Sequence, residues 1–301
     1  MTLSPIVLFV YKRPGHTKRM IESLKLNPEY SRSLISVYCD GAKDVQEQPE
    51  VLATRDIVQE LLPGANFIES DVNLGLAASI IRGVTEQCEI HERVIVFEDD
   101  LVMSPVTLRY FNEALEFYRN HDKVMHVSAY MYPVKEELPS TFFFHEASCW
   151  GWATWKRAWD HFEPNTSIII DHLLKYGNLK KFNTGYSYLY WKMLLAQAQG
   201  KIDSWAIRWY GSVFMNNGLA LHPACSYTQN TGFDGTGVHC STTKEFEVDL
   251  SNEVPIFSDN LDENSKAVNS IIKYRGKYNS LFDNRIQYYV SMLPYILKRS
   301  V

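Results

Sequence analysis

The stretch VIVFEDDLVMSP, residues 94–105, decides the fold because it runs from an apolar strand directly into a cluster of acids. Four apolar residues lead into Glu98, Asp99 and Asp100, and an apolar pair follows at once. Burying one unpaired carboxylate costs several kcal/mol, so three adjacent acids need cations, hydrogen-bond donors or open water. The stretch therefore predicts a buried strand whose end opens on a polar crevice.

Strands and helices alternate on both sides of this stretch over the first 130 residues. Apolar, β-branched runs predict strands, and helical spacing of apolar residues predicts helices. The strands are expected at 5–11, 33–40, 66–70 and 93–100, and the helices at 16–26, 49–64, 74–88 and 104–121. Ser104 is the expected N-cap of the last helix and Pro105 its first residue. The alternation indicates an α/β fold, a mostly parallel sheet flanked by helices.

Polar side chains follow three of these strands at the point where each ends. Lys12 and Arg13 come after the first strand, Asp40 after the second and the acidic cluster after the fourth. The carboxyl ends of parallel strands form the ligand-binding edge of such a sheet. These side chains should therefore converge on one crevice.

Composition excludes several classes of protein. The 301 residues are 46% hydrophobic and 22% charged, as in ordinary globular proteins, and the net charge of −5 disfavours a general nucleic-acid binder. The five cysteines form no CxxC pair, and their odd number favours a reducing compartment. No apolar run approaches the roughly 20 residues that span a bilayer. The N-terminal segment reads as a strand rather than a signal peptide, so we expect a cytoplasmic protein.

The acidic cluster has two interpretations from spacing alone. Mg²⁺ and Mn²⁺ prefer carboxylate oxygens and keep room for waters or a diphosphate, so the cluster is typical of a divalent-metal site. A strand that simply ends in solvated acids is the alternative. The spacing leaves both open.

From the first strand to the acidic cluster, roughly residues 5–130, the chain resembles nucleotide-sugar glycosyltransferases of the GT-A fold. The nearest resemblance is to inverting N-acetylglucosaminyltransferases that act on mannose, together with bacterial polysaccharide glycosyltransferases. Their EDD variant of the Asp-x-Asp motif matches Glu98, Asp99 and Asp100. The resemblance implies that Asp100 holds the metal, while Glu98 and Asp99 face the ribose and base of the nucleotide.

Other positions match the same family. Arg13 in YKRPGH and Asp40 in VYCDG stand where the family meets its nucleotide. The segment DVNLGLAASIIRG, residues 71–83, is similar to an Asn-x-Gly helix start, in which Gly75 permits close backbone approach and Arg82 reaches a phosphate or base. Ordinary structural roles are the alternatives: a solvated arginine at 13, a turn residue at 40 and a surface arginine at 82.

The resemblance implies a metal-dependent glycosyltransferase that moves a sugar from a UDP-linked donor to a glycan or lipid-linked saccharide, with inversion. The cofactor is Mn²⁺ or Mg²⁺, with His239 from the glycine-rich loop at 230–239 as a further ligand. For the general base we choose Asp203 in GKIDSWAIRW, since IDSW resembles the family's acidic pair before a tryptophan. A helix-capping aspartate is the alternative there. Residues 1–130 would bind the donor and 131–301 the acceptor, within one continuous domain.

The second half is rich in aromatic residues. Trp152, Trp155 and Trp159 have helical spacing, which predicts a helix that buries them, and we expect one of the four tryptophans from Trp150 to Trp159 to contact sugar. A helix is expected at 186–199 and a strand at 219–230. The tail at 285–300 is either packed on the domain or in peripheral contact with the inner face of a membrane.

Two other functions stay open. A sugar-phosphate nucleotidyltransferase shares the metal carboxylates but needs a glycine-rich triphosphate loop after the first strand, where YKRPGH is poor in glycine. A non-catalytic glycan-binding protein keeps the aromatic residues but has no need of the EDD cluster.

Overall fold

The computed structural model describes residues 2–235 and 245–298. Its N-terminal part is a unit of alternating strands and helices. These are β1 (Ile6–Val10), α1 (Pro14–Lys25), β2 (Ile35–Cys39), α2 (Gln48–Leu61), β3 (Asn66–Glu69), α3 (Leu76–His91) and β4 (Arg93–Glu98), with a short 3₁₀ turn at Tyr30–Arg32. The four strands are parallel in the order β3-β2-β1-β4. Helices cover both faces, which is why the strands are continuous apolar runs.

The same sheet continues into the second half of the chain. Here β8 (Trp152–Trp155) lies antiparallel between β4 and β6 (Val124–Ser128), β9 (Leu219–Pro223) follows β6 in parallel, and β7 (Thr141–Phe144) forms the edge. The eight-stranded order is β3-β2-β1-β4-β8-β6-β9-β7. The predicted α/β fold with flanking helices is confirmed, although the second half of the sheet is mixed rather than parallel.

A separate two-stranded sheet was not predicted. Strand β5 (Leu101–Met103) pairs antiparallel with β10 (Thr228–Asn230), with Leu101 opposite Asn230. The strand predicted at 219–230 is thus two strands in two sheets, because the chain turns away after Pro223. This pairing fixes the residues after Asn230 beside the acidic cluster.

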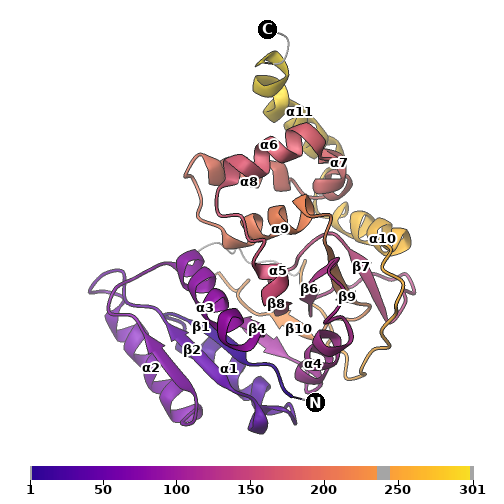
Figure 1. Ribbon diagram of the computed structural model, residues 1–301. Helices are drawn as coiled ribbons and strands as arrows, with labels where there is room; N and C mark the ends of the chain where they lie inside the picture. Colours follow the sequence, from indigo (N-terminus) through magenta and orange to yellow (C-terminus); the bar gives the residue numbers. More distant parts are fainter. Residues whose placement is uncertain (1, 236–244, 299–301) are drawn as a thin grey trace.

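The remaining helices cover the sheet and extend the molecule. They are α4 (Thr107–Phe117), α5 (Lys156–Trp159), α6 (Thr166–Tyr176), α7 (Leu179–Phe182), α8 (Tyr190–Ala198), α9 (Trp205–Met215), α10 (Ser265–Arg275) and α11 (Leu281–Lys298), with a 3₁₀ turn at Thr184–Tyr186. Figure 1 shows α6 to α9 gathered at the end of the molecule away from α1 and α2. None of the helices that the structure describes combines the length and apolar content needed to cross a bilayer.

Two core clusters lie on the two faces of the sheet. Leu8 of β1 packs in one cluster, and its neighbours Val7 and Phe9 pack in the other, as strand alternation requires. The helix predicted through Trp152 and Trp155 was wrong: these residues form β8, and only Lys156–Trp159 is helical. Burial of both faces removes the alternation that marks a strand.

The start of α4 also differs from the prediction. The helix begins at Thr107 after Val106, not after Ser104. The Ser104 hydroxyl donates instead to the Ser251 carbonyl oxygen at 2.6 Å and ties a distant segment to the end of β5. Its oxygen also accepts from the N–H of Val106 at 3.3 Å, so the side chain bonds both to the turn before α4 and to the distant segment.

Candidate active site

The carboxyl ends of β1, β2 and β4 meet at one edge of the sheet, as predicted. The register pairs Val10 with Cys39 and Phe9 with Glu98, so the residues after each strand follow side by side. Across this edge, Nη1 of Arg13 donates to Oδ2 of Asp100 at 3.2 Å. The structure therefore brings Arg13 and the acidic cluster together.

Asp100 is held from the other side by the chain that follows β10. Its carbonyl oxygen accepts from the backbone N–H of Thr231 at 2.8 Å and from the Thr231 hydroxyl at 2.9 Å. Its Oδ1 lies 3.4 Å from the side-chain amide of Asn230. A Cβ on Gly232 would lie only 2.3 Å from Oδ2 of Asp100. Glycine at 232 thus lets the backbone close against the carboxylate.

Burial raises the pKa of all three acids. Burial raises the pKa of Glu98 well above its ordinary value, and Asp100 and Asp99 add to it. Burial and the charge of Asp100 raise the pKa of Asp99 to about 7 against the opposing charge of Arg13. Burial likewise raises the pKa of Asp100, and Arg13 opposes it. Extra positive charge here favours the ionised carboxylates, so the cluster is suited to a cation.

His16 and Asp234 extend the site on the far side of Arg13. Nε2 of His16 lies 2.9 Å from Nη2 of Arg13 and 3.1 Å from Oδ2 of Asp234. Burial and the charges of Arg13 and Arg19 lower the pKa of His16. Nε2 also lies 3.3 Å from the Thr231 carbonyl oxygen, so this one nitrogen faces a donor, Arg13, and two acceptor oxygens. Asp234, 42% exposed, adds a carboxylate at the rim.

Sequence reasoning assigned no role to His16, Asn230 or Gly232. His16 stands three residues after Arg13 in YKRPGH, one helical turn away at the start of α1. Asn230 and Gly232 open the glycine-rich stretch NTGFDG. An amide residue and a glycine directly after a strand were the sequence signal that could have indicated a site here. That strand pairs with β5, however, which lies 125 or more positions earlier in the chain.

Asp40 lies at the same edge, but its carboxylate is already engaged. Oδ1 accepts from the backbone N–H groups of Gly41 at 2.9 Å and Leu74 at 2.8 Å. Oδ2 accepts from the N–H of Gly75 at 2.9 Å and from the Asn73 side chain at 3.2 Å. Four donors fill the acceptor sites of one carboxylate. Asp40 therefore positions the segment that leads into α3.

Gly75 and Arg82 lie on the same side of this edge as Asp40. Gly75 precedes α3 with a φ of +80°, and no atom lies within 4 Å of a Cβ built there. Glycine is therefore favoured at position 75 by the positive φ of the backbone, and not by a lack of space for a side chain. Nε of Arg82, half exposed, lies 2.7 Å from Glu86 one turn along α3. Arg82 also lines a small hollow with Asp40 and Ser79.

Asp203, the predicted general base, and His239, the predicted second metal ligand, are not among the residues that contact Asp100 in the bonds described above. Asp203 precedes α9, is 67% exposed and accepts from Nη2 of Arg208 at 2.7 Å. The N-cap of α9 is its neighbour Ser204, whose hydroxyl accepts from the N–H of Ile207. The capping role considered for Asp203 thus belongs to Ser204. His239 lies outside the described residues.

An aromatic-walled cavity of about 300 Å³ adjoins Asp100. Its lining includes Asn230, Asp234, Phe233 and Phe246. Trp150 meets Phe233 and Phe246 edge to face, with ring centroids 5.4 and 5.0 Å apart. Trp152, Trp155 and Trp159 are buried, whereas Trp150 is part-exposed. The expectation that most of the tryptophans belong to the core is confirmed.

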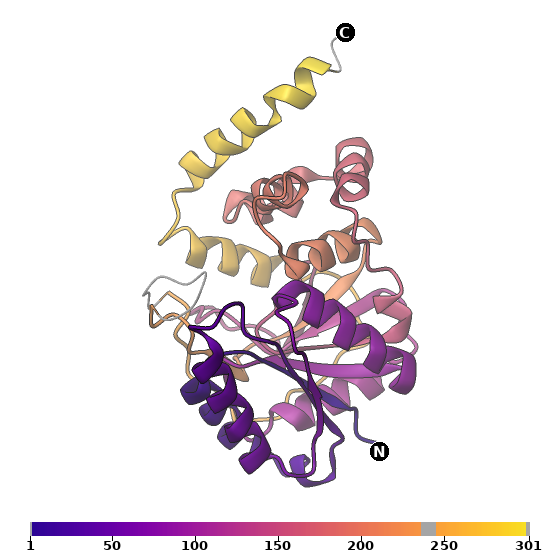
Figure 2. The same ribbon diagram turned by 90° about the vertical axis from the view of Figure 1, so that its left-hand side faces the viewer.

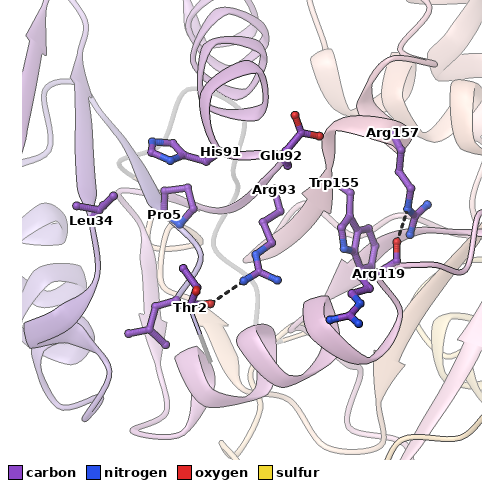
Figure 3. A pocket seen from close by; sticks show the side chains of 10 residues that line it. Thr2, Pro5, Leu34, His91, Glu92, Arg93, Arg119, Trp155 and Arg157 are labelled. Carbon is purple, nitrogen blue, oxygen red and sulfur yellow. Dashed lines mark hydrogen bonds between the residues drawn. The ribbon is translucent and has the colours of Figure 1, made fainter.

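Another cavity, about 420 Å³, lies at the opposite edge of the sheet and is shown in Figure 3. The three arginine side chains that line it already bond within the protein, and that of Arg119 pairs with Glu116. Nη2 of Arg93 donates to the Thr2 carbonyl at 2.6 Å, and Arg157 donates to the Arg119 carbonyl at 3.0 Å. It borders the amino ends of β1 and β4, away from the ligand-binding edge of an α/β sheet. We therefore assign the site to the edge that carries Asp100.

Among residues 2–235 and 245–298, no group of three or more His, Cys, Asp or Glu side chains is placed to hold a metal ion. Mg²⁺ sites that share substrate phosphates need only one or two protein carboxylates. The donor set at Asp100 is of that open kind.

Comparison with known proteins found similarity only among solved structures. No family model matches the chain, and no curated protein matches it. Residues 1–349 of Staphylococcus aureus TarS share 11% identity with a TM-score of 0.42, and the match covers 76% of this chain and 60% of that one. The chain therefore spans less than two thirds of the TarS structure that it resembles.

Two further similar structures are glycosyltransferases, the class that the sequence resemblance indicates. Mouse xyloside xylosyltransferase 1 shares 12% identity, TM-score 0.35, over 71% of this chain and 80% of that one. The mannosyltransferase PcManGT from Pyrobaculum calidifontis, solved with GDP-Man and Mn²⁺, shares 11% identity, TM-score 0.39, over 70% and 74%. These TM-scores describe a loose likeness of chain path, so the function is inferred from the residues of this chain.

Proposed function

We propose that this chain is a metal-dependent glycosyltransferase that transfers a sugar from a UDP-linked donor to a glycan hydroxyl with inversion. The observation that carries the proposal is the Arg13–Asp100 contact at the carboxyl edge of a parallel β3-β2-β1-β4 unit. This edge is where open α/β sheets bind nucleotides. An arginine beside a carboxylate cluster provides a donor fork for phosphate and an anionic centre for a metal at one place.

The residues present fit a hard divalent cation. Asp100 presents a carboxylate whose two oxygens face Arg13, Asn230 and the Gly232 backbone. Mg²⁺ or Mn²⁺ takes oxygen ligands of this type and shares them with phosphates. Asp100 would hold the ion, which would neutralise the charge of the leaving diphosphate.

The chain's own residues orient the donor around that point. Arg13 can meet a phosphate while it also bonds to Asp100, because its guanidinium presents several N–H donors. Asp40 fixes the backbone at Leu74 and Gly75, so that the loop before α3 keeps one shape beside the nucleotide. Arg82 at the edge of the small hollow is the further candidate for a base or phosphate contact.

The acceptor side is assigned to the aromatic cavity beyond Asn230. Sugar rings present C–H faces that lie well on aromatic side chains. Phe233 and Phe246 are the aromatic residues that line this cavity, and Trp150 packs against both. Asp203 is our choice of general base, a carboxylate outside the metal-binding cluster that would take the proton of the attacking hydroxyl. Glu98 and Asp99 are assigned to the nucleotide side.

A sugar-phosphate nucleotidyltransferase is disfavoured by the loop after β1. That strand ends at Val10 and α1 begins at Pro14, so only Tyr11, Lys12 and Arg13 separate them. A triphosphate cradle is a longer, glycine-rich loop. We also propose a cytoplasmic location, since the four cysteines among the described residues are free.

The test is a panel of nucleotide sugars assayed for slow hydrolysis in the presence of Mn²⁺, with the purified chain and its Asp100→Asn variant. We expect one donor to be hydrolysed by the wild type, and the rate to fall in the variant and with excess EDTA. Hydrolysis that is equal in both proteins and insensitive to EDTA would refute a metal-dependent transferase centred on Asp100.

A further inference from the structure

The C-terminal helix α11 carries apolar side chains on two faces, and one of these faces packs on the protein. Tyr288 is buried, and Met292 and Tyr295 pack with the helical cluster around Trp191. The Asn284 side chain donates at 3.0 Å to the carbonyl oxygen of Tyr186, in the 3₁₀ turn at Thr184–Tyr186. This face anchors the helix and sets which side of it points away.

The other face exposes a row of apolar side chains. Their spacing of three and four residues places them on one side of a helix. We call this row the α11 stripe; its members are Phe282, Ile286, Tyr289, Val290 and Leu293. The most exposed of these side chains is that of Phe282, at 72%. Figure 2 shows α11 running outward from the body of the molecule.

Positive charge surrounds the α11 stripe. Segments 179–199 and 281–295 together contain one acid, Asp283, and four basic residues, namely Lys180, Lys181, Lys192 and Arg285. Their local net charge is +3, in a chain whose total is −5. Lys181 lies 2.8 Å from Glu263, so part of this charge is neutralised within the protein. The apolar row and the excess of cations still occupy the same end of the molecule.

Contacts place three of these cations next to α11 itself. Nζ of Lys192 donates to the Gln287 side chain at 3.0 Å. The guanidinium of Arg285 lies 5.9 Å from the ring centroid of Tyr289. A hydrogen bond from Arg285 lowers the pKa of Tyr289, and the charge of Lys180 adds to that effect. The cations therefore border the stripe rather than a distant part of the surface.

An apolar helix face bordered by cations fits one kind of partner better than others. We propose that α11 binds the surface of an anionic lipid bilayer, with its stripe at the headgroup boundary and Lys180, Lys192 and Arg285 against lipid phosphates. A second copy of the chain fits less well, because a two-fold contact would bring the same positive surface against itself. The proposal stands independently of the sugar-transfer chemistry.

The test is flotation of the purified chain with vesicles. One set is phosphatidylcholine alone, and the other contains about one part in three of phosphatidylglycerol. The stripe variant is Phe282→Ser/Val290→Ser/Leu293→Ser and the charge variant is Lys180→Glu/Lys192→Glu/Arg285→Glu. The matched control removes three exposed apolar residues from the other end of the molecule, Leu26→Ser/Val45→Ser/Leu52→Ser. Thermal unfolding checks that each variant is folded.

We expect the wild type and the control to float with the anionic vesicles and not with the phosphatidylcholine vesicles. The bound fraction should fall at high salt. The stripe and charge variants should bind at least about tenfold more weakly. If the stripe variant does not fold, the charge variant decides. Absence of wild-type flotation, or equal flotation of wild type and charge variant, overturns the proposal. A lipid-free dimer that the stripe variant converts to a monomer, seen by light scattering, also overturns it in favour of self-association.

Discussion

Arg13 and Asp100 are 87 positions apart in the sequence, yet Nη1 of the guanidinium lies 3.2 Å from Oδ2 of the carboxylate. The parallel pairing of β1 with β4 creates this contact, since each residue follows the end of its strand. Burial alone raises the pKa of Asp100, and the charge of Arg13 opposes that rise. The charge of Arg13 thus favours the ionised form of a carboxylate in a partly buried place where a cation can bind it.

The close approach of Gly232 to this carboxylate gives the first prediction. In Gly232→Ala the new methyl group would lie 2.3 Å from Oδ2 of Asp100 and 3.1 Å from Nη1 of Arg13. Overpacking of this kind costs about 1–3 kcal/mol. We expect UDP affinity in the presence of Mn²⁺ to fall about tenfold or more, measured by calorimetry.

Gly64→Ala is the matched control, because no atom lies within 4 Å of a Cβ there. It should bind UDP as the wild type does. An unchanged affinity in Gly232→Ala would show that the loop after β10 does not shape the nucleotide site.

The second prediction concerns Asp203 as general base. Asp203→Asn should keep donor binding and reduce the transfer rate by about 10²–10⁴, measured by single-turnover kinetics once a donor and acceptor are known. Arg208→Gln serves as the control, since it removes the ion-pair partner of Asp203 and leaves the carboxylate in place. Equal losses in both variants would assign Asp203 to the ion pair instead of the chemistry, and Asp234 would become the next candidate.

A buried ion pair in the second half gives the third prediction. The Arg275 guanidinium contacts both carboxylate oxygens of Glu146, and Nη1 lies 2.9 Å from Oε2. Tyr132 and Thr184 complete the cluster through their hydroxyls. Glu146→Gln leaves the buried guanidinium without its counter-charge, which costs about 3–5 kcal/mol.

Urea unfolding should therefore show a large fall in the free energy of unfolding for Glu146→Gln. The double variant Glu146→Gln/Arg275→Met removes both charges, and we expect it to recover part of the loss. A single variant as stable as the wild type would mean that the pair contributes little to the fold.

His126 gives a pH-dependent prediction. Its Nδ1 accepts from the Trp209 indole at 3.0 Å, and its Nε2 lies 3.0 Å from the Ser148 carbonyl. Burial and the charge of His222 lower the pKa of His126 from 6.5 to about 3. Between pH 6.5 and about 3, His126 is protonated in the unfolded chain but neutral in the folded chain. The free energy of unfolding therefore falls as the pH decreases through this range.

The slope contributed by His126 is about 1.4 kcal/mol per pH unit. Chemical unfolding between pH 7 and 4 should be less pH-dependent in His126→Gln than in the wild type. His161→Gln, at an exposed position, is the control and should keep the wild-type slope. Identical slopes in all three proteins would contradict a neutral, buried His126.

Much of the N-terminal half could be predicted from sequence because its signals are local. The apolar runs of β1, β2 and β4 and the polar residues that follow them lie within a few positions of each other. Parallel topology then places Arg13, Asp40 and Asp100 at one edge without further information. The roles of Asp40 and Gly75 could not be read in this way, since the four donors on Asp40 depend on the path of the loop at residues 73–75.

The pairing of β5 with β10 could not be predicted, because neither short strand has a periodic pattern and their partners lie far apart in sequence. That pairing brings Asn230 and Gly232 to Asp100. Helix α11 continues through Pro294, a residue that usually breaks helices. Long-range contacts, rather than local propensity, completed the site.

Calorimetric titration of UDP into the purified chain with and without Mn²⁺, repeated with Asp100→Asn, tests the metal role of Asp100 most directly. The wild type should bind UDP when Mn²⁺ is present, and EDTA should weaken the binding at least about tenfold. Asp100→Asn should lose the metal dependence while it stays folded. UDP affinity that is the same with and without Mn²⁺ in both proteins would contradict the metal role of Asp100. No UDP binding under any condition would contradict the transferase itself and favour a non-catalytic glycan-binding protein.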